Sequence, residues 1–134
     1  MKMKGRVIKK GRVEGEAVVI SSPFSFVGDM DIATGDGNFL HELNGKNIAG
    51  KILVFTKGRG TTSAALAGYY VKLLGKLPAG MICHETDPVI ALNAIMNDFP
   101  VMDRTDVDPV EAIDSGDHVI LDADEGIIEV VKKA

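Results

Sequence analysis

One stretch limits the fold more than any other: an uninterrupted apolar run that leads through a glycine-rich loop into a helical pattern. Residues 52–55 are all apolar, which is typical of a strand buried on both faces of a sheet. Residues 57–63 follow, with two glycines, two cations and three hydroxyl side chains. Apolar residues then recur at helical spacing over residues 64–74, and Gly75 can end the helix. This order predicts a strand, loop and helix unit within an α/β fold.

Shorter apolar runs, separated by glycine and proline, predict the rest of the sheet. A helix is expected over residues 88–96, with Asp87 as its N-cap and Pro88 in its first turn, and a helical turn over residues 109–113. The last two strands are expected to form a hairpin. The expected strands cover residues 6–8, 16–20 (around a turn region at Gly11 and Gly15), 51–55, 80–83, 99–102, 118–122 and 127–131. The pattern predicts a mixed sheet of roughly half a dozen strands with two main helices.

Length and charge narrow the class of protein. The 134 residues are expected to form one domain, residues 1–134. With 15 basic against 19 acidic residues, the chain lacks the basic face that a nucleic-acid partner requires. No apolar run is long enough to cross a membrane, and the basic N-terminus is not followed by the apolar segment of a signal peptide. A lone cysteine, Cys83, excludes an internal disulfide. A cytoplasmic protein without nucleic-acid or membrane partners is therefore expected.

The glycine-rich loop is the strongest candidate for a binding site. Its glycines allow backbone amides to approach a ligand closely, and the free amides at the start of the next helix favour an anion. Lys57 and Arg59 add positive charge at the same place. The alternative is structural, because Ser and Thr are also the usual residues that cap a helix. The expected loop reads Lys57-Gly58-Arg59-Gly60-Thr61-Thr62-Ser63.

Other polar residues carry weaker signals. The connection before residue 37 contains Asp29, Asp31 and Asp36, whose spacing fits no calcium loop, so a solvated loop is expected. The three histidines, among them His41, lie in separate contexts and are expected to be structural or on the surface. No metal site is predicted in this chain.

Five segments, in order along nearly the whole chain, resemble the small swivelling subunit of the aconitase X family. They are residues 24–28, 31–35, 50–55, 57–62 and 122–126. The resemblance implies a swivelling β/β/α domain like the mobile domain of aconitase. It also implies a large partner subunit of the aconitase type that holds an iron–sulfur cluster on its own cysteines. This chain is then expected to bind no cofactor itself, in agreement with its one cysteine.

The family also implies the activity, that of a hydro-lyase (a dehydratase) whose site is shared with the large subunit and whose small subunit is inactive alone. Its members act on small anions, either 5-phosphomevalonate or a hydroxy acid such as cis-3-hydroxy-L-proline. Lys57 and Arg59 suit a phosphate or a carboxylate, so the sequence leaves the substrate open. A free-standing anion- or metabolite-binding module without catalysis is the alternative. A third interpretation is a structural subunit whose loop merely caps a helix.

The resemblance further implies that a serine of the loop acts as the base. The family usually has Gly-Ser-Thr or Gly-Ser-Ser after the basic residue, whereas this chain has threonines there. Thr61 takes the serine's place without a gap, and Ser63 is the serine within reach. A primary hydroxyl is less hindered, which favours Ser63 over Thr61. The expected substrate-binding residues are Lys57, Gly58, Arg59, Gly60 and Thr62.

Overall fold

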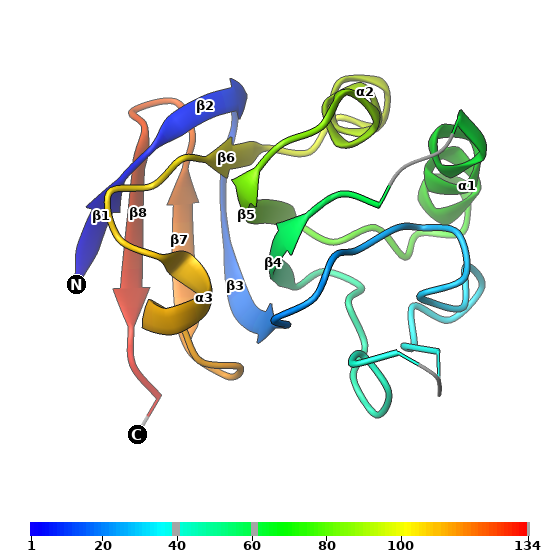
Figure 1. Ribbon diagram of the computed structural model, residues 1–134, viewed down its shortest axis with the longest axis horizontal. Coiled ribbons are helices and arrows are strands. Elements are labelled where there is room, and N and C mark those ends of the chain that lie inside the picture. The colour runs from blue at the N-terminus through cyan, green and yellow to red at the C-terminus, as the bar shows by residue number, and fades with distance from the viewer. Residues whose placement is uncertain (39–40, 60–61, 134) are drawn as a thin grey trace.

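The computed structural model describes residues 1–38, 41–59 and 62–133, and of residues 62–65 it describes the backbone alone. Within these ranges the strands form one eight-stranded sheet in the order β1-β8-β7-β3-β4-β5-β6-β2 (Figure 1). The strands are β1 (Lys2–Lys4), β2 (Arg6–Lys9), β3 (Arg12–Val19), β4 (Ile52–Lys57), β5 (Gly80–Glu85), β6 (Val101–Asp103), β7 (His118–Asp122) and β8 (Ile127–Val131). The helices are α1 (Thr62–Leu73), α2 (Pro88–Asn97) and α3 (Pro109–Ala112).

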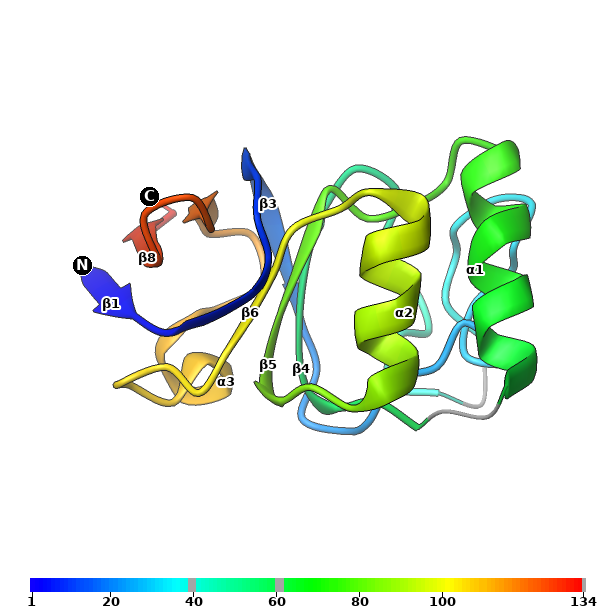
Figure 2. The same ribbon diagram turned by 90° about the horizontal axis from the view of Figure 1, so that it is seen from above.

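The sheet consists of two halves that share β3. Residues 12–16 of β3 pair with β7 in an antiparallel half that continues to β8 and β1. Residues 17–19 of β3 pair with β4 in a parallel half that continues to β5 and β6, with β2 antiparallel at its edge. Figure 2 shows α1 and α2 on one side of β4 and β5, and the antiparallel half on the other side. The predicted mixed sheet, its β/β/α layering and its two main helices are therefore confirmed.

Strand β4 explains why its sequence is apolar at successive positions. Leu53 and Phe55 belong to the core between the sheet and the helices. Ile52 and Val54 belong to a second core, between the two halves of the sheet. Side chains of a strand alternate between its faces, so a strand between two cores buries every position. All four side chains are fully buried, as the sequence predicted.

The expected start of α2 is confirmed in detail. Asp87 has an extended backbone, and its carboxylate accepts a hydrogen bond from the backbone N–H of Ile90 at 2.8 Å. Pro88 occupies the first turn, where it removes no helical hydrogen bond. This cap fixes the start of α2 at the same edge of the sheet where β4 and β5 end.

In the N-terminal region one strand was not predicted and one expectation was wrong. Strand β1 was not predicted, because three residues with one buried side chain, Met3, are too short to show an alternating pattern. Gly15, expected from the sequence at a turn, lies inside β3, opposite Val119. Strand β2 pairs with β6. The hairpin of β7 and β8 was predicted and is confirmed. Among the described residues no helix has the length and apolarity needed to cross a membrane.

Candidate functional site

The predicted loop leaves the sheet at the carboxyl edge of its parallel strands. β4 ends at Lys57, which pairs in register with Glu85 at the end of β5. Residues 57–59 then turn toward the start of α1 (Figure 2). The carboxyl ends of parallel strands are where α/β proteins usually bind their ligands. The topology therefore places the loop in the region of the fold best suited to a binding site.

A buried aromatic residue anchors this loop. The backbone N–H of Phe24 donates to the carbonyl of Lys57 at 3.0 Å, and the N–H of Arg59 donates to the carbonyl of Phe24 at 2.9 Å. The Phe24 ring is fully buried, 5.2 Å from the ring of Phe26 and 5.9 Å from that of Phe55. The long connection before β4 thus runs beside the loop and fixes its backbone through the core.

Gly58 brings the loop against the N-terminus of α2. A Cβ at this position would overlap the carboxylate of Asp87 and would lie 2.7 Å from Cγ1 of Ile90. Real Cβ contacts almost never come so close, so the approach requires glycine here. The neighbour that requires glycine here is α2, and the predicted approach of the Gly58 backbone to a ligand stays a prediction.

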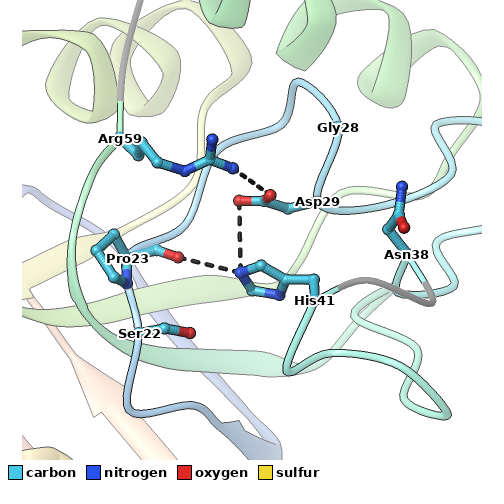
Figure 3. Close-up of a pocket in the computed structure, with 7 residues that line it drawn as sticks. All are labelled: Ser22, Pro23, Gly28, Asp29, Asn38, His41 and Arg59. Atoms are coloured by element: carbon cyan, nitrogen blue, oxygen red, sulfur yellow. Dashed lines mark hydrogen bonds and ion pairs between the residues drawn. The ribbon is translucent and has the colours of Figure 1, made fainter.

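Arg59 forms an ion pair that the sequence did not indicate. Its guanidinium pairs through one terminal nitrogen with Oδ1 of Asp29 (Figure 3). The Asp29 side chain is only 6% exposed, and its Oδ2 accepts a hydrogen bond from the backbone N–H of Ser25 at 2.8 Å. The imidazole of His41 lies on the far side of this carboxylate, with Nε2 3.6 Å from Oδ2. A cation, an anion and an imidazole therefore meet at one point beside the loop.

An open pocket of about 400 Å³ lies over this group. The Arg59 side chain is 56% exposed, so part of its guanidinium remains free to meet a ligand. The pocket is the size of a small-molecule site. Its lining consists of Ser22, Pro23, Gly28, Asp29, Asn38, His41 and Arg59.

The structure describes only some of the remaining predicted site residues. Lys57 is exposed, and no described residue pairs with its ammonium group. Thr62 and Ser63 are the first two residues of α1, and their side chains are outside the description. Gly60 and Thr61 lie outside the described residues. The loop and the beginning of α1 are thus adjacent in the chain, as expected, while the position of each candidate hydroxyl stays a prediction.

Sequence reasoning missed Asp29 and His41. Asp29 was expected in a solvated loop, but it is buried and paired. His41 was expected to be structural or on the surface, and it lines the pocket. Asp29 precedes Arg59 by 30 positions, so no local spacing signals their contact.

The described residues do not fit an iron–sulfur cluster. Within the described ranges no group of three or more His, Cys, Asp or Glu side chains is placed to hold a metal ion. The thiol of Cys83 is fully buried, and burial raises its pKa to about 12. A cluster ligand must be a thiolate, which this environment strongly disfavours.

Comparison with known proteins identifies the family. A family model of the aconitase X swivel domain matches residues 2–130. The chain belongs to the aconitase X family. It is 40% identical to the phosphomevalonate dehydratase small subunit of Methanosarcina mazei, covering 99% of this chain and 93% of that protein. The proteins of the same name from Thermococcus kodakarensis and Methanocaldococcus jannaschii are 38% and 36% identical, and each alignment covers at least 98% of both chains. These relatives are named as subunits of a dehydratase, which is a hydro-lyase.

Two solved structures share the fold of this chain. The crystal structure of Thermococcus kodakaraensis aconitase X in its holo-form matches with a TM-score of 0.90 at 38% identity, over 98% of this chain and 99% of that chain. A solution NMR structure of a UPF0107 protein matches with a TM-score of 0.88 at 36% identity, over 98% and 100%. The fold predicted from the resemblance to this family is confirmed.

Proposed function

We propose that this chain is the small subunit of a phosphomevalonate dehydratase and that it completes a substrate site shared with a large subunit. The names of the relatives support the partner, the reaction and the substrate. One observation in this chain carries the proposal. An exposed arginine, Arg59, is fixed beside an open pocket at the carboxyl edge of the sheet, two residues after the exposed Lys57.

Lys57 and Arg59 bind the phosphate of the substrate in this proposal. An arginine offers planar, paired donors that match a phosphate, and a lysine adds a compact positive charge. Thr62 contributes its backbone N–H at the start of α1, and Gly60, which lies outside the described residues, is proposed to bind the same anion. Free amides at a helix N-terminus favour an anion. The phosphate holds the rest of the substrate over the loop, so the reacting carbon atoms lie close to its hydroxyl groups.

A hydroxyl of the same loop acts as the base, Ser63 in preference to Thr61. It removes a proton from one carbon of the substrate, the C–H electron pair becomes the new carbon–carbon double bond, and hydroxide leaves the adjacent carbon. Proton and hydroxide together make one water. A hydroxyl is a weak base and has to be held as the alkoxide, and in this proposal helix N-terminal amides and the positive charge of Lys57 stabilise it.

In this proposal the large subunit holds the iron–sulfur cluster on its own cysteines, as the resemblance to the family implies. The two main helices offer a surface for that subunit. Exposed apolar side chains recur at helical spacing on each, which places them on one face of each helix. Such exposed apolar faces mark protein interfaces. They are Leu66, Tyr69, Tyr70 and Leu73 on α1 and Leu92, Ile95 and Met96 on α2.

The test is an assay of the complex of this chain with its large subunit, prepared without oxygen. We expect it to dehydrate 5-phosphomevalonate, and neither subunit to do so alone. Ser63→Ala or Thr61→Ala should abolish kcat while the thermal midpoint stays unchanged. Thr105→Ala is the control, because it removes a hydroxyl that lies outside this pocket and donates to the carbonyl of Val107.

Three results would contradict the proposal, each at a different point. Full activity in both hydroxyl variants rules out the hydroxyl base. A complex that turns over cis-3-hydroxy-L-proline but not 5-phosphomevalonate rules out the proposed substrate. A chain that binds inorganic phosphate alone and never joins a large subunit is instead a free-standing anion-binding module.

A further inference from the structure

The Asp29 carboxylate is held from three directions. Arg59 pairs with Oδ1, and Nε2 of His41 lies 3.6 Å from Oδ2 (Figure 3). The backbone N–H of Ser25 donates to Oδ2. A carboxylate that is 6% exposed has a fixed orientation, because leaving it unpaired at this depth would be costly. The fixed Asp29 carboxylate therefore sets the orientation of the Arg59 guanidinium that pairs with it.

His41 is itself fixed through both ring nitrogens. Its Nδ1 accepts the backbone N–H of Leu43 at 3.1 Å, so the ring proton lies on Nε2. Nε2 faces the carbonyl of Pro23 at 3.2 Å and can donate to it. The imidazole therefore forms a rigid wall behind Asp29 and limits the directions in which the carboxylate can turn.

Arg59 is anchored at its backbone and at one edge of its side chain. Its N–H donates to Phe24, and one terminal nitrogen pairs with Asp29. Within the described residues its other guanidinium N–H groups have no partner, and the side chain is 56% exposed. A free arginine side chain samples many rotamers, which binding must restrict. The ion pair selects one of these rotamers before the ligand arrives.

We infer that Asp29 is a positioning residue, which holds the Arg59 guanidinium toward the pocket so that its free edge receives the anionic group of the substrate. This inference rests on the proposed function, since it assigns Arg59 the phosphate. In this role Asp29 touches no reacting atom. Its contribution lies in the affinity for the anion, and it acts through Arg59.

The test is Asp29→Asn in the complex with the large subunit. The amide can still accept the N–H of Ser25 but lacks the charge that holds the guanidinium. We expect KM for 5-phosphomevalonate to rise about 3- to 10-fold and kcat to change less than twofold. Inhibition by inorganic phosphate should weaken by a similar factor. Asp31→Asn is the matched control, because this exposed carboxylate of the same loop accepts the N–H of Ala33 instead.

A double-mutant cycle separates positioning from a general effect on the fold. Arg59→Ala should raise KM, and adding Asp29→Asn should raise it no further. An equal increase in KM from Asp29→Asn in the presence and absence of Arg59 overturns the inference. So does an unchanged KM in a folded single variant. If Asp29→Asn fails to fold, Asp29→Glu keeps the charge, moves it by one methylene and must raise KM at an unchanged thermal midpoint.

The proposed function fails in a distinguishable way. If Arg59→Ala leaves KM and phosphate inhibition unchanged in an active complex, Arg59 does not bind the anion. If Arg59→Ala raises KM while Asp29→Asn does not, the anion site stands and the positioning role of Asp29 is excluded.

Discussion

Replacing Gly58 by alanine tests the contact between the loop and α2. The added Cβ overlaps the Asp87 carboxylate and lies 2.7 Å from Cγ1 of the buried Ile90. Ile90 is fixed in the core and cannot move away, so either Asp87 leaves its capping position or the loop leaves α2. The first outcome breaks the 2.8 Å bond from the Ile90 N–H and destabilises the fold. The second displaces Arg59 and weakens anion binding.

The size of the effect follows from these contacts. Overpacking at a tight site costs about 1–3 kcal/mol. Loss of an aspartate N-cap costs about 1 kcal/mol more. We therefore expect the free energy of unfolding to fall by about 3 kcal/mol. At an unfolding entropy of about 2.1 cal/mol/K per residue, this lowers the thermal midpoint of a chain of 134 residues by about 10 °C.

Thermal unfolding of the isolated chain, followed by circular dichroism, measures the first outcome, and KM of the complex measures the second. Gly15→Ala is the matched control, because Gly15 lies inside β3 and its nearest contact, the Gly50 carbonyl, would be 3.3 Å from a Cβ. We expect this control to change the midpoint by less than about 3 °C. A Gly58→Ala chain with the midpoint of the control and an unchanged KM would refute the packing argument.

Two further predictions concern titratable groups. Burial by itself raises the pKa of Asp117, but hydrogen bonds from Lys132 and from two backbone N–H groups outweigh it and lower the pKa to about 2. The ionised Asp117 therefore stabilises the fold above about pH 4, and this stabilisation disappears as the pH falls toward 2. Asp117→Asn should lower the free energy of unfolding, measured in urea, by about 2 kcal/mol at pH 7 and by little at pH 2. Cys83, with its pKa raised to about 12 by burial, should react with a thiol reagent at pH 8 more than about 100-fold more slowly in the folded chain than in urea. Equal rates would contradict its burial.

Much of the fold could be predicted because its signals are local. The four apolar residues of β4, the Asp87 cap and the hairpin of β7 and β8 each follow from residues a few positions apart. The pairing of β1 with β8 was beyond such reasoning. It joins residues more than 120 positions apart, and one buried side chain, Met3, gives no pattern.

In the candidate site, too, the local features could be predicted from the sequence and the long-range contacts could not. Composition marked Lys57 and Arg59 as an anion-binding pair, but it could not supply the counter-charge of Arg59. That partner comes from the connection before β4, whose path is set by the burial of Phe24 and its hydrogen bonds to Lys57 and Arg59. Once Phe24 is in the core, the loop that carries Asp29 has to lie beside Arg59. The orientation of the guanidinium is therefore a consequence of core packing, and a substitution of Phe24 should disturb anion binding as well as stability.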